Sequence, residues 1–409
     1  MWNLKKAPII FHGVISFRKW ISLKKLLMKV AVIIVNYRLR YFLEQTLLSV
    51  AEAAEGLDCA TIVVDNASGD GSIDFLRPRF PNVTFIENTE NVGFSRANNQ
   101  GFADAADADF ILVLNPDTII GRRTIRDCLD WMESHADCAA IGVRMLDGNG
   151  QFLPESKRSF PSIWNSFCKL FGLSKLFPRS RVFARYHLRY LPENEPNVVP
   201  VLAGAFMFVD NKRLQAVGGF DEDFFMYGED MDLAYRLAQD SWQNYYLPTP
   251  IIHYKGECTK TESANYVKIF YGAMLIFYRK HYPRRQWLSR IMITPAIWLR
   301  MLLSLINKKI VKPIARLFHN SNGRTLPTYV ISDNTGILST ATAEGFGSCQ
   351  LVASIDEVPA DEACNIILDD SRFTYEQIID TIDRNSSSRR LFHIYSSRNA
   401  LIISPKKQR

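Results

Sequence analysis

The sequence predicts an α/β fold built on a mostly parallel sheet. Short runs of β-branched apolar residues, typical of buried strands, alternate in the first third of the chain with stretches whose apolar residues recur at helical spacing. Strands that are separated by helices pair in parallel, because the chain must cross back over the sheet before the next strand. Ligands of such sheets bind beyond the carboxyl ends of the strands, so the residues that follow each strand are the first candidates for a site.

Four strands and two helices can be placed in this region. Every apolar run is too short to cross a membrane, which takes about 20 residues of helix. The strands span Lys29–Asn36, Thr61–Val64, Val83–Glu87 and Phe110–Leu114, and the helical patterns include Leu43–Val50 and Arg96–Asn98. Polar residues follow the strands and converge on one rim of the sheet: Asn36, Tyr37, Asp65, Asn66, Asn91, Gly93, Asn115 and Asp117.

Composition sets limits on function. The chain has 409 residues, 47% of them apolar, so it can bury a large core and form two or three domains. Its net charge of +7 is concentrated in Met1 to Lys29, which contains seven Lys or Arg and no acid. The remainder is neutral, which argues against a nucleic-acid binder. Seven cysteines without a CxxC pair give neither a disulfide framework nor a zinc site, as expected in a reducing cytoplasm.

Residues 1–28 form a basic N-terminal tail. Its apolar patch, Pro8–Phe17, is interrupted by Arg18 and Lys19 and lacks a small-residue cleavage site, so we do not predict a signal peptide. Two interpretations stay open. Either translation starts at Met28, directly before the first strand, or the tail is a basic amphipathic arm that touches anionic lipid.

An acidic stretch, Gly218–Leu237, contains a predicted helix that begins after Gly228. Glu229, Asp230 and Asp232 fall in its first turn, where free N–H groups and the helix dipole favour ionised carboxylates. An ionised carboxylate can act as a base. The alternative is that these acids only complement the helix dipole.

Six motifs follow one another between Val32 and Thr259. They read VIIVNYR, VVDNASGDGS, ENTENVGFSRANNQG, LVLNPDT, GGFDEDFFMYGEDMDLAYRL and IIHYKGECT. In these motifs the sequence resembles the family 2 glycosyltransferases, in the group similar to bacterial rhamnosyltransferases and related cell-surface glycan enzymes. The resemblance implies a GT-A type fold, an NDP-sugar donor, a divalent metal ion and inversion at the anomeric carbon.

Asp117 and His253 are the metal ligands that the resemblance implies. The carboxylate of Asp117 suits Mg²⁺ or Mn²⁺ held against a diphosphate. Ile251 and Ile252 predict a short strand that ends at His253, whose imidazole would favour Mn²⁺ without excluding Mg²⁺. Asn115 stands where the family often has a second acid, which leaves Asp117 as the strong ligand of this loop. The alternatives are a simple turn after the strand and a structural histidine.

The resemblance also implies a donor site. Asp65 matches the family aspartate that contacts the nucleoside, and Asn66 stands where a second acid is common. Asn91 and Gly93 resemble the residues at which the backbone approaches the donor. Arg96 either pairs with phosphate bidentately or is a surface charge. The predicted donor edge also includes Asn36, Tyr37, Asn115 and Lys255, the last either offsetting diphosphate charge or lying solvated in its loop.

Asp230 matches the catalytic base of the family. It would take the proton of the acceptor hydroxyl as the new bond forms in a single in-line displacement, with no covalent intermediate. We expect Glu229 to orient the base or the acceptor, and Asp232 to serve the local helix structure.

The predicted glycosyltransferase domain, 29–262, contains one basic segment and is followed by another. Its insertion, 156–191, has eight Lys or Arg, many aromatics and no acid, and forms a lid, a lipid-facing surface or an irregular subdomain. Residues 263–327 are basic and amphipathic. Their apolar run Ile291–Ile306 is too short to span a bilayer, so we predict helices on the inner membrane face. Residues 328–409 predict a small Rossmann-like α/β module. Its predicted strands are Tyr329–Ser332, Gln350–Ser354, Asn365–Leu368 and Leu401–Ser404, and its predicted helix is Tyr375–Ile382.

The leading hypothesis is a cytoplasmic glycosyltransferase, peripheral to the inner face of the cell membrane, that transfers a sugar to a lipid-linked or surface polysaccharide. The resemblance makes dTDP-rhamnose the first donor to test and leaves UDP-hexoses open. The alternative is a non-catalytic scaffold that binds glycans or nucleotide sugars in a glycan-assembly complex. Nucleic-acid binding would require salt-sensitive affinity for oligonucleotides.

Overall fold

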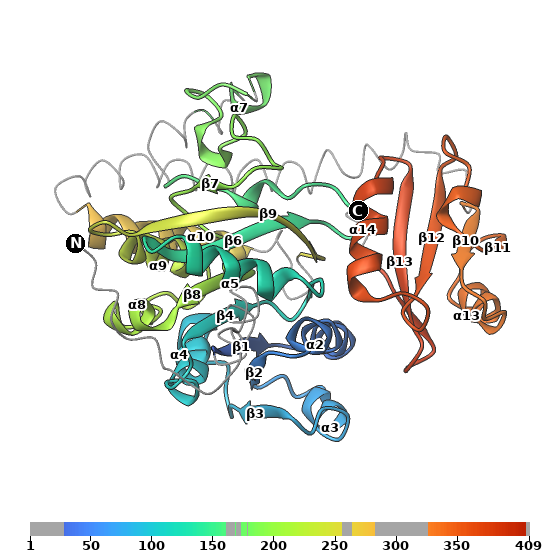
Figure 1. The fold of residues 1–409 in the computed structure, drawn as a ribbon, viewed down its shortest axis with the longest axis horizontal. Helices are drawn as coiled ribbons and strands as arrows, with labels where there is room; N and C mark the ends of the chain where they lie inside the picture. The colour runs from blue at the N-terminus through green and yellow to red at the C-terminus, as the bar shows by residue number, and fades with distance from the viewer. Residues whose placement is uncertain are drawn as a thin grey trace, which may run out of the picture.

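The computed structural model describes residues 28–160, 168, 173–177, 179–255, 264–282 and 326–405. The predicted N-terminal tail, the predicted membrane-surface helices around Ile291–Ile306 and part of the 156–191 insertion lie outside these ranges. The described residues form two sheets, each in its own module, which lie side by side in Figure 1. No helix in these ranges is long and apolar enough to span a bilayer.

The larger sheet confirms the predicted α/β fold. Within the described residues it has nine strands in the order β3-β2-β1-β4-β8-β6-β9-β5, with β7 paired to β9. β3, β2, β1, β4, β6 and β9 all run in one direction, and β8, β5 and β7 run against them. The strands are β1 (Lys29–Asn36), β2 (Asp58–Asp65), β3 (Val83–Glu87), β4 (Phe110–Leu114), β5 (Thr118–Ile119), β6 (Cys138–Leu146), β7 (Asn197–Val198), β8 (Phe206–Asp210) and β9 (Gln243–His253).

Helices cover both faces of this sheet. Successive side chains of a strand point to opposite faces of the sheet, so a strand whose residues are nearly all apolar, such as β1, is buried on both faces. In β1, Val30, Val32 and Ile34 face one core, and Ala31, Ile33 and Val35 face the other. The first core includes α2 (Arg40–Ala54), α3 (Ser72–Leu76) and α5 (Thr124–Ser134); the second includes α4 (Phe94–Asp104), α8 (Asn211–Ala216) and α9 (Glu229–Leu237).

Strand β9 is longer than the sequence predicts. The expectation of a short strand at Ile251 and Ile252 is wrong, because β9 begins at Gln243. The register against β6 shifts where Leu247 pairs with Val143 and Pro250 with Arg144, which leaves two residues of β9 in a bulge. A bulge accommodates Pro248, which has no N–H to donate to the ladder. Pro248 and Pro250 interrupt the strand pattern in the sequence, although the strand itself is continuous.

The smaller module is the predicted C-terminal α/β unit. Its sheet has the order β11-β10-β12-β13-β14, in which β14 alone runs antiparallel to its neighbour. Strand β13 and helix α13 are additions to the sequence prediction. The elements are β10 (Thr328–Ile331), α13 (Gly336–Ala343), β11 (Cys349–Val352), β12 (Cys364–Asp369), α14 (Tyr375–Asn385), β13 (Arg390–Ser396) and β14 (Leu401–Ile403).

Helix α14 joins the two modules. One hydrophobic cluster combines Ile119, Ile252 and Tyr254 of the larger module with Ile378 and Ile382 of α14. Charged groups border it: Arg144 donates to both oxygens of Asp383 at 2.7 and 2.9 Å, and Arg123 pairs with Glu376. Figure 1 shows α14 on the side of its sheet that faces the larger module. The C-terminal module is thus packed on the larger module through a shared core.

We predict that Asp383→Ala lowers the free energy of unfolding by about 3 kcal/mol, because it leaves the guanidinium of Arg144 buried without its partner. Arg144 is 14% exposed and Asp383 is 26% exposed. The matched control is Asp380→Ala on the same helix, where the pair with Arg384 is exposed and contributes about 0.3–0.5 kcal/mol. Chemical denaturation measures both, and equal losses would show that the Arg144 pair does not hold the modules together.

Candidate donor and catalytic site

The carboxyl ends of β1 and β2 place Asn36 beside Asp65. The two residues are partners in the parallel register, and both are buried. Asn36 Nδ2 donates to Asp65 Oδ1 at 2.7 Å, and Ser68 donates to both oxygens of Asp65 through its Oγ and its backbone N–H. Asn36 Oδ1 is buried and has no partner among the described residues. An N–H group of a nucleobase would satisfy this acceptor.

Ser68 and Arg38 belong to the same edge, although the sequence predicts neither of them as a site residue. The backbone N–H of Arg38 donates to Ser68 Oγ at 2.9 Å, and its Nε donates to Ser68 O at 3.1 Å. The guanidinium of Arg38 lies 5.1 Å from the ring centroid of Tyr37. The only sequence signal for either residue was its place inside a family motif.

Asn66 positions the loop that contains Asn91 and Gly93. Its Nδ2 donates to Asn91 Oδ1 at 2.9 Å and to Gly93 O at 3.2 Å, and its Oδ1 accepts from the Val92 N–H. Gly93 has a positive φ of 88°, and a Cβ there would lie 2.7 Å from the carbonyl oxygen of Phe225. Only glycine fits at position 93, because the backbone of the acidic stretch Gly218–Leu237 lies directly against it. The donor contacts of Asn66, Asn91 and Gly93 stay predictions.

Arg96 and Lys255 each have a carboxylate partner. Arg96 Nε donates to Glu222 at 3.0 Å, and both side chains are about half exposed. Lys255 forms an ion pair with Glu155, which the sequence analysis does not single out. Burial alone would raise the pKa of Glu155, but the charge of Lys255 and its hydrogen bond outweigh burial and lower it. Phosphate binding by Arg96 or Lys255 would require exchange of these partners, and it stays a prediction.

Asp117 and His253 lie together at the end of the sheet. β5 pairs with β9 so that Thr118 is opposite His253, and the Tyr254 N–H donates to Asp117 O at 3.0 Å. Asp117 Oδ1 is 3.4 Å from His253 Nε2, which is also 3.4 Å from Asn115 Nδ2. Both Asp117 and His253 are buried.

This pair fits a divalent ion. Two ligands held at about 2.1 Å from one octahedral ion lie roughly 3 Å apart, close to the distance between the two side chains. In the described part of the chain, no cluster offers three or more His, Cys, Asp or Glu side chains to a metal. Phosphate oxygens and water would supply the remaining ligands, as is usual for Mg²⁺ and Mn²⁺ in phosphate chemistry. The metal role of Asp117 and His253 stays a prediction.

Asp230 stands in the first turn of α9 and accepts three hydrogen bonds. Its Oδ2 accepts from Arg158 Nη2 at 2.5 Å and from the Gly204 N–H at 3.2 Å, and its Oδ1 accepts from the Met231 N–H at 2.7 Å. The side chains of Arg158 and Asp230 are 14% and 15% exposed. From the sequence alone, Arg158 is only one of the basic residues of the 156–191 insertion.

Glu229 differs from its neighbour. Burial and the charge of Asp230 raise the pKa of Glu229 to about 8, so its carboxyl group is largely protonated at neutral pH. Its Oε2 is buried without a hydrogen-bond partner in the described ranges. The expectation that the helix dipole keeps Glu229 ionised is therefore wrong, because the loss of solvation outweighs the dipole.

Asp232 ties α9 to α10 (Ala264–His281). It is fully buried and accepts from Arg236 Nε at 2.7 Å and from His281 Nε2 at 2.6 Å. Burial alone would raise the pKa of Asp232, but the hydrogen bond from His281 and the charge of Arg236 lower it. Asp232 thus links two helices, which extends the local role expected for it.

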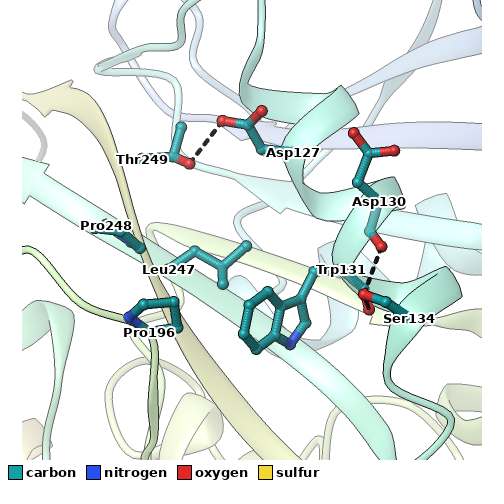
Figure 2. A pocket seen from close by; sticks show the side chains of 8 residues that line it. All are labelled: Asp127, Asp130, Trp131, Ser134, Pro196, Leu247, Pro248 and Thr249. Atoms are coloured by element: carbon teal, nitrogen blue, oxygen red, sulfur yellow. Dashed lines mark hydrogen bonds between the residues drawn. The ribbon is translucent and has the colours of Figure 1, made fainter.

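A surface hollow of about 270 Å³ lies between α5 and β9, away from these residues. Figure 2 shows its lining, in which Thr249 donates a hydrogen bond to Asp127 and Trp131 lies beside Leu247. None of the predicted site residues lines it; the lining residues are Asp127, Asp130, Trp131, Ser134, Pro196, Leu247, Pro248 and Thr249. The candidate site is therefore the polar edge of the sheet and not this hollow.

Comparisons with known proteins agree with the motifs. The model of the family described as glycosyl transferase family 2 matches residues 31–214. An N-acetylglucosaminyl-diphospho-decaprenol L-rhamnosyltransferase of Mycobacterium tuberculosis is 31% identical over 259 residues, which are 60% of this chain and 82% of that protein. Rhamnosyltransferase WbbL of Escherichia coli is 29% identical over 171 residues, 40% of this chain and 61% of that protein.

Solved structures show a distant likeness. The structure of residues 1–349 of TarS from S. aureus has 17% identity and a TM-score of 0.41, with 61% of this chain and 64% of that chain covered. The mannosyltransferase PcManGT from Pyrobaculum calidifontis has 15% identity and a TM-score of 0.42, with 75% and 88% covered. From its sequence relatives and its motifs, this chain belongs to the family 2 glycosyltransferases, in the rhamnosyltransferase-like group, and is a hexosyltransferase with the GT-A type sheet expected of that family.

Proposed function

We propose that this glycosyltransferase is metal-dependent and inverting, and that it moves a sugar from an NDP-sugar to a lipid-linked acceptor. The observation that carries the proposal is the 3.4 Å separation of Asp117 Oδ1 and His253 Nε2, at the edge of the sheet where Asn36 and Asp65 also lie. A divalent cation at this pair would offset the charge that develops on the leaving diphosphate. Asn36 and Asp65 would bind the nucleoside at the neighbouring strand ends.

Asp230 would take the proton of the acceptor hydroxyl. It is a carboxylate at a helix N-terminus, oriented by three hydrogen bonds, and an in-line displacement needs a base on the side of the sugar carbon opposite the diphosphate. Glu229, protonated at neutral pH, would donate a hydrogen bond to the acceptor rather than share the proton transfer. The raised pKa of Glu229 thus gives the two adjacent carboxyl groups separate roles.

For the donor we propose dTDP-rhamnose, with UDP-hexoses as the alternative, because the relatives from M. tuberculosis and E. coli are named rhamnosyltransferases. For the acceptor we propose a sugar carried on a diphospho-lipid, the kind named for the M. tuberculosis relative. A lipid-linked acceptor also suits the basic residues 263–327, which we propose lie on the inner membrane face. We propose that the chain is divided into a catalytic domain, 29–262, the basic segment 263–327 and the C-terminal module, 328–409.

We predict that Asp230→Asn lowers kcat by roughly two to four orders of magnitude and leaves the affinity for the nucleotide sugar unchanged, because it removes only the base. Initial rates and donor titrations measure the two effects. Asp240→Asn, at an exposed carboxylate, is the control that should retain full turnover. If Asp230→Asn turns over like this control, another group must be the base.

We predict that EDTA abolishes transfer and Mn²⁺ restores it, and that His253→Ala raises the Mn²⁺ concentration for half activation by at least about 10-fold. Titration of the initial rate measures activation, and paramagnetic resonance of free Mn²⁺ measures binding without turnover. His135→Ala, at a histidine that stacks on Trp131, should change neither. Transfer that resists EDTA would refute the metal proposal, and donor binding without transfer from any tested NDP-sugar would favour a binding scaffold.

We predict that activity declines as pH rises through about 8, where Glu229 loses its proton, and that Glu229→Gln removes this decline because an amide keeps a donor at all pH values. The same shift affects stability. The pKa of Glu229 is higher in the fold than in the unfolded chain, so its contribution to the free energy of unfolding is fullest below pH 4.5 and falls toward pH 8.

The pH profiles of kcat and of unfolding in wild type and Glu229→Gln measure both effects. An alkaline decline that persists in Glu229→Gln would assign it to a different group.

A further inference from the structure

Arg158 is the cation in contact with the proposed base. Its backbone forms a bridge with Val201, through hydrogen bonds of 3.2 and 3.1 Å in the two directions. Its Nη2 donates to Asp230 Oδ2 at 2.5 Å and to Leu202 O at 2.7 Å. The backbone of Arg158 is thus fixed, and its guanidinium is shared between a carbonyl and the carboxylate that must accept a proton.

The surroundings keep Arg158 charged. Burial alone would lower the pKa of its guanidinium, but Asp230, Tyr186 and Glu155 outweigh burial and raise it. Glu155 is in turn paired with Lys255, next to His253. Acids and bases therefore alternate from α9 to the end of β9, in the order Asp230, Arg158, Glu155, Lys255.

This contact opposes the function of a base. The Oδ2 of Asp230 accepts from Arg158 and from the Gly204 N–H, and its Oδ1 accepts from the Met231 N–H, so most of its lone pairs are engaged and few are open to an acceptor hydroxyl. Proton transfer requires Arg158 to release Asp230 Oδ2. Something that binds with the acceptor must then take the guanidinium, because a buried charge is not left without a partner.

The position of Arg158 identifies that group. In an in-line displacement the acceptor oxygen and the leaving diphosphate lie on opposite sides of the sugar carbon. A cation that touches the base is therefore on the acceptor side, away from the leaving diphosphate. A planar guanidinium suits the oxygens of a phosphate, which it can bind with two parallel hydrogen bonds.

We propose that Arg158 recognises a phosphate of the acceptor and, in exchanging Asp230 for that phosphate, frees the base only when an anionic acceptor is bound. The inference rests on the proposed function, and it makes Arg158 a residue that determines acceptor specificity. The same exchange protects the donor from water, because without the acceptor phosphate Asp230 stays engaged by Arg158. Lys157, the adjacent basic residue, has a different role, since its Nζ donates to Leu191 O and Pro192 O.

The test compares two acceptors that differ only in the diphosphate: phenoxyalkyl-diphospho-N-acetylglucosamine and phenoxyalkyl N-acetylglucosaminide. We expect wild type to prefer the diphosphate compound in kcat/KM, and Arg158→Gln to reduce this preference by about 30-fold or more. Transfer to the neutral compound and donor hydrolysis without acceptor should both rise, because Asp230 is no longer engaged by Arg158. Arg158→Lys should retain part of the preference, because a point charge binds phosphate without the bidentate geometry.

The matched control is Arg144→Gln, because Arg144 is also 14% exposed and also pairs with an aspartate, but at the module interface. It should keep the acceptor preference of wild type. Equal losses with both acceptors in Arg158→Gln would overturn the proposal, since they would show that Arg158 only orients Asp230.

A binding measurement separates this inference from the proposed function. Isothermal titration of the diphosphate compound, without donor, should show a loss of affinity of about 30-fold or more in Arg158→Gln and none in Arg144→Gln. Unchanged affinity in Arg158→Gln would refute phosphate recognition. If Arg158 supports binding but wild type transfers from no NDP-sugar, the proposed function fails while the phosphate site stands.

Discussion

The pairing of β5 with β9 is the constraint on which the site depends. It is two residues long, yet it places Thr118 opposite His253 and is extended by the hydrogen bond from the Tyr254 N–H to Asp117 O. Main-chain bonds thus fix the two candidate metal ligands relative to each other. Thr46 of α2 adds to this, because its hydroxyl contacts the carbonyl oxygens of Pro116 and Thr118. The ligand positions therefore follow from backbone geometry and need no direct bond between the side chains.

The C-terminal module completes the core behind this pairing. Ile119 of β5 and Ile252 of β9 are fully buried in a cluster that they share with α14, and Tyr254 is part of the same cluster. Tyr375 at the start of α14 also donates its backbone N–H to Glu52 of α2. Because residues beside both candidate ligands belong to this shared cluster, the module is structurally coupled to the site, although it contributes none of the predicted site residues.

The sequence predicts those parts of the fold whose signal is local. The predicted bounds of β1, β3 and β4 equal the observed ones, since β1 and β4 are apolar runs followed or ended by an asparagine, and β3 is a short β-branched and aromatic run that ends at Glu87. Strand β9 was cut short by its prolines, and β13 was missed because Arg390 and His393 interrupt its apolar pattern. The neighbouring positions of Asp117 and His253 were expected only from the family resemblance. Arg158 was missed because its partner is 72 residues away, and no local pattern records such a contact.

The two adjacent carboxyl groups at the start of α9, Glu229 and Asp230, face a single guanidinium, that of Arg158. Glu229 and Asp230 stand in the same helical turn and share the helix dipole, so they differ in their contacts and not in the dipole. Burial without a partner raises the pKa of Glu229, whereas Asp230 has an arginine and two backbone donors. A protonated Glu229 leaves a single negative charge for Arg158 to balance. Were both carboxyl groups ionised, removal of Arg158 would leave two adjacent negative charges with little solvent, and exchange to a phosphate would be far costlier. In the proposed exchange, the raised pKa of Glu229 would therefore lower the cost of opening the contact between Arg158 and Asp230.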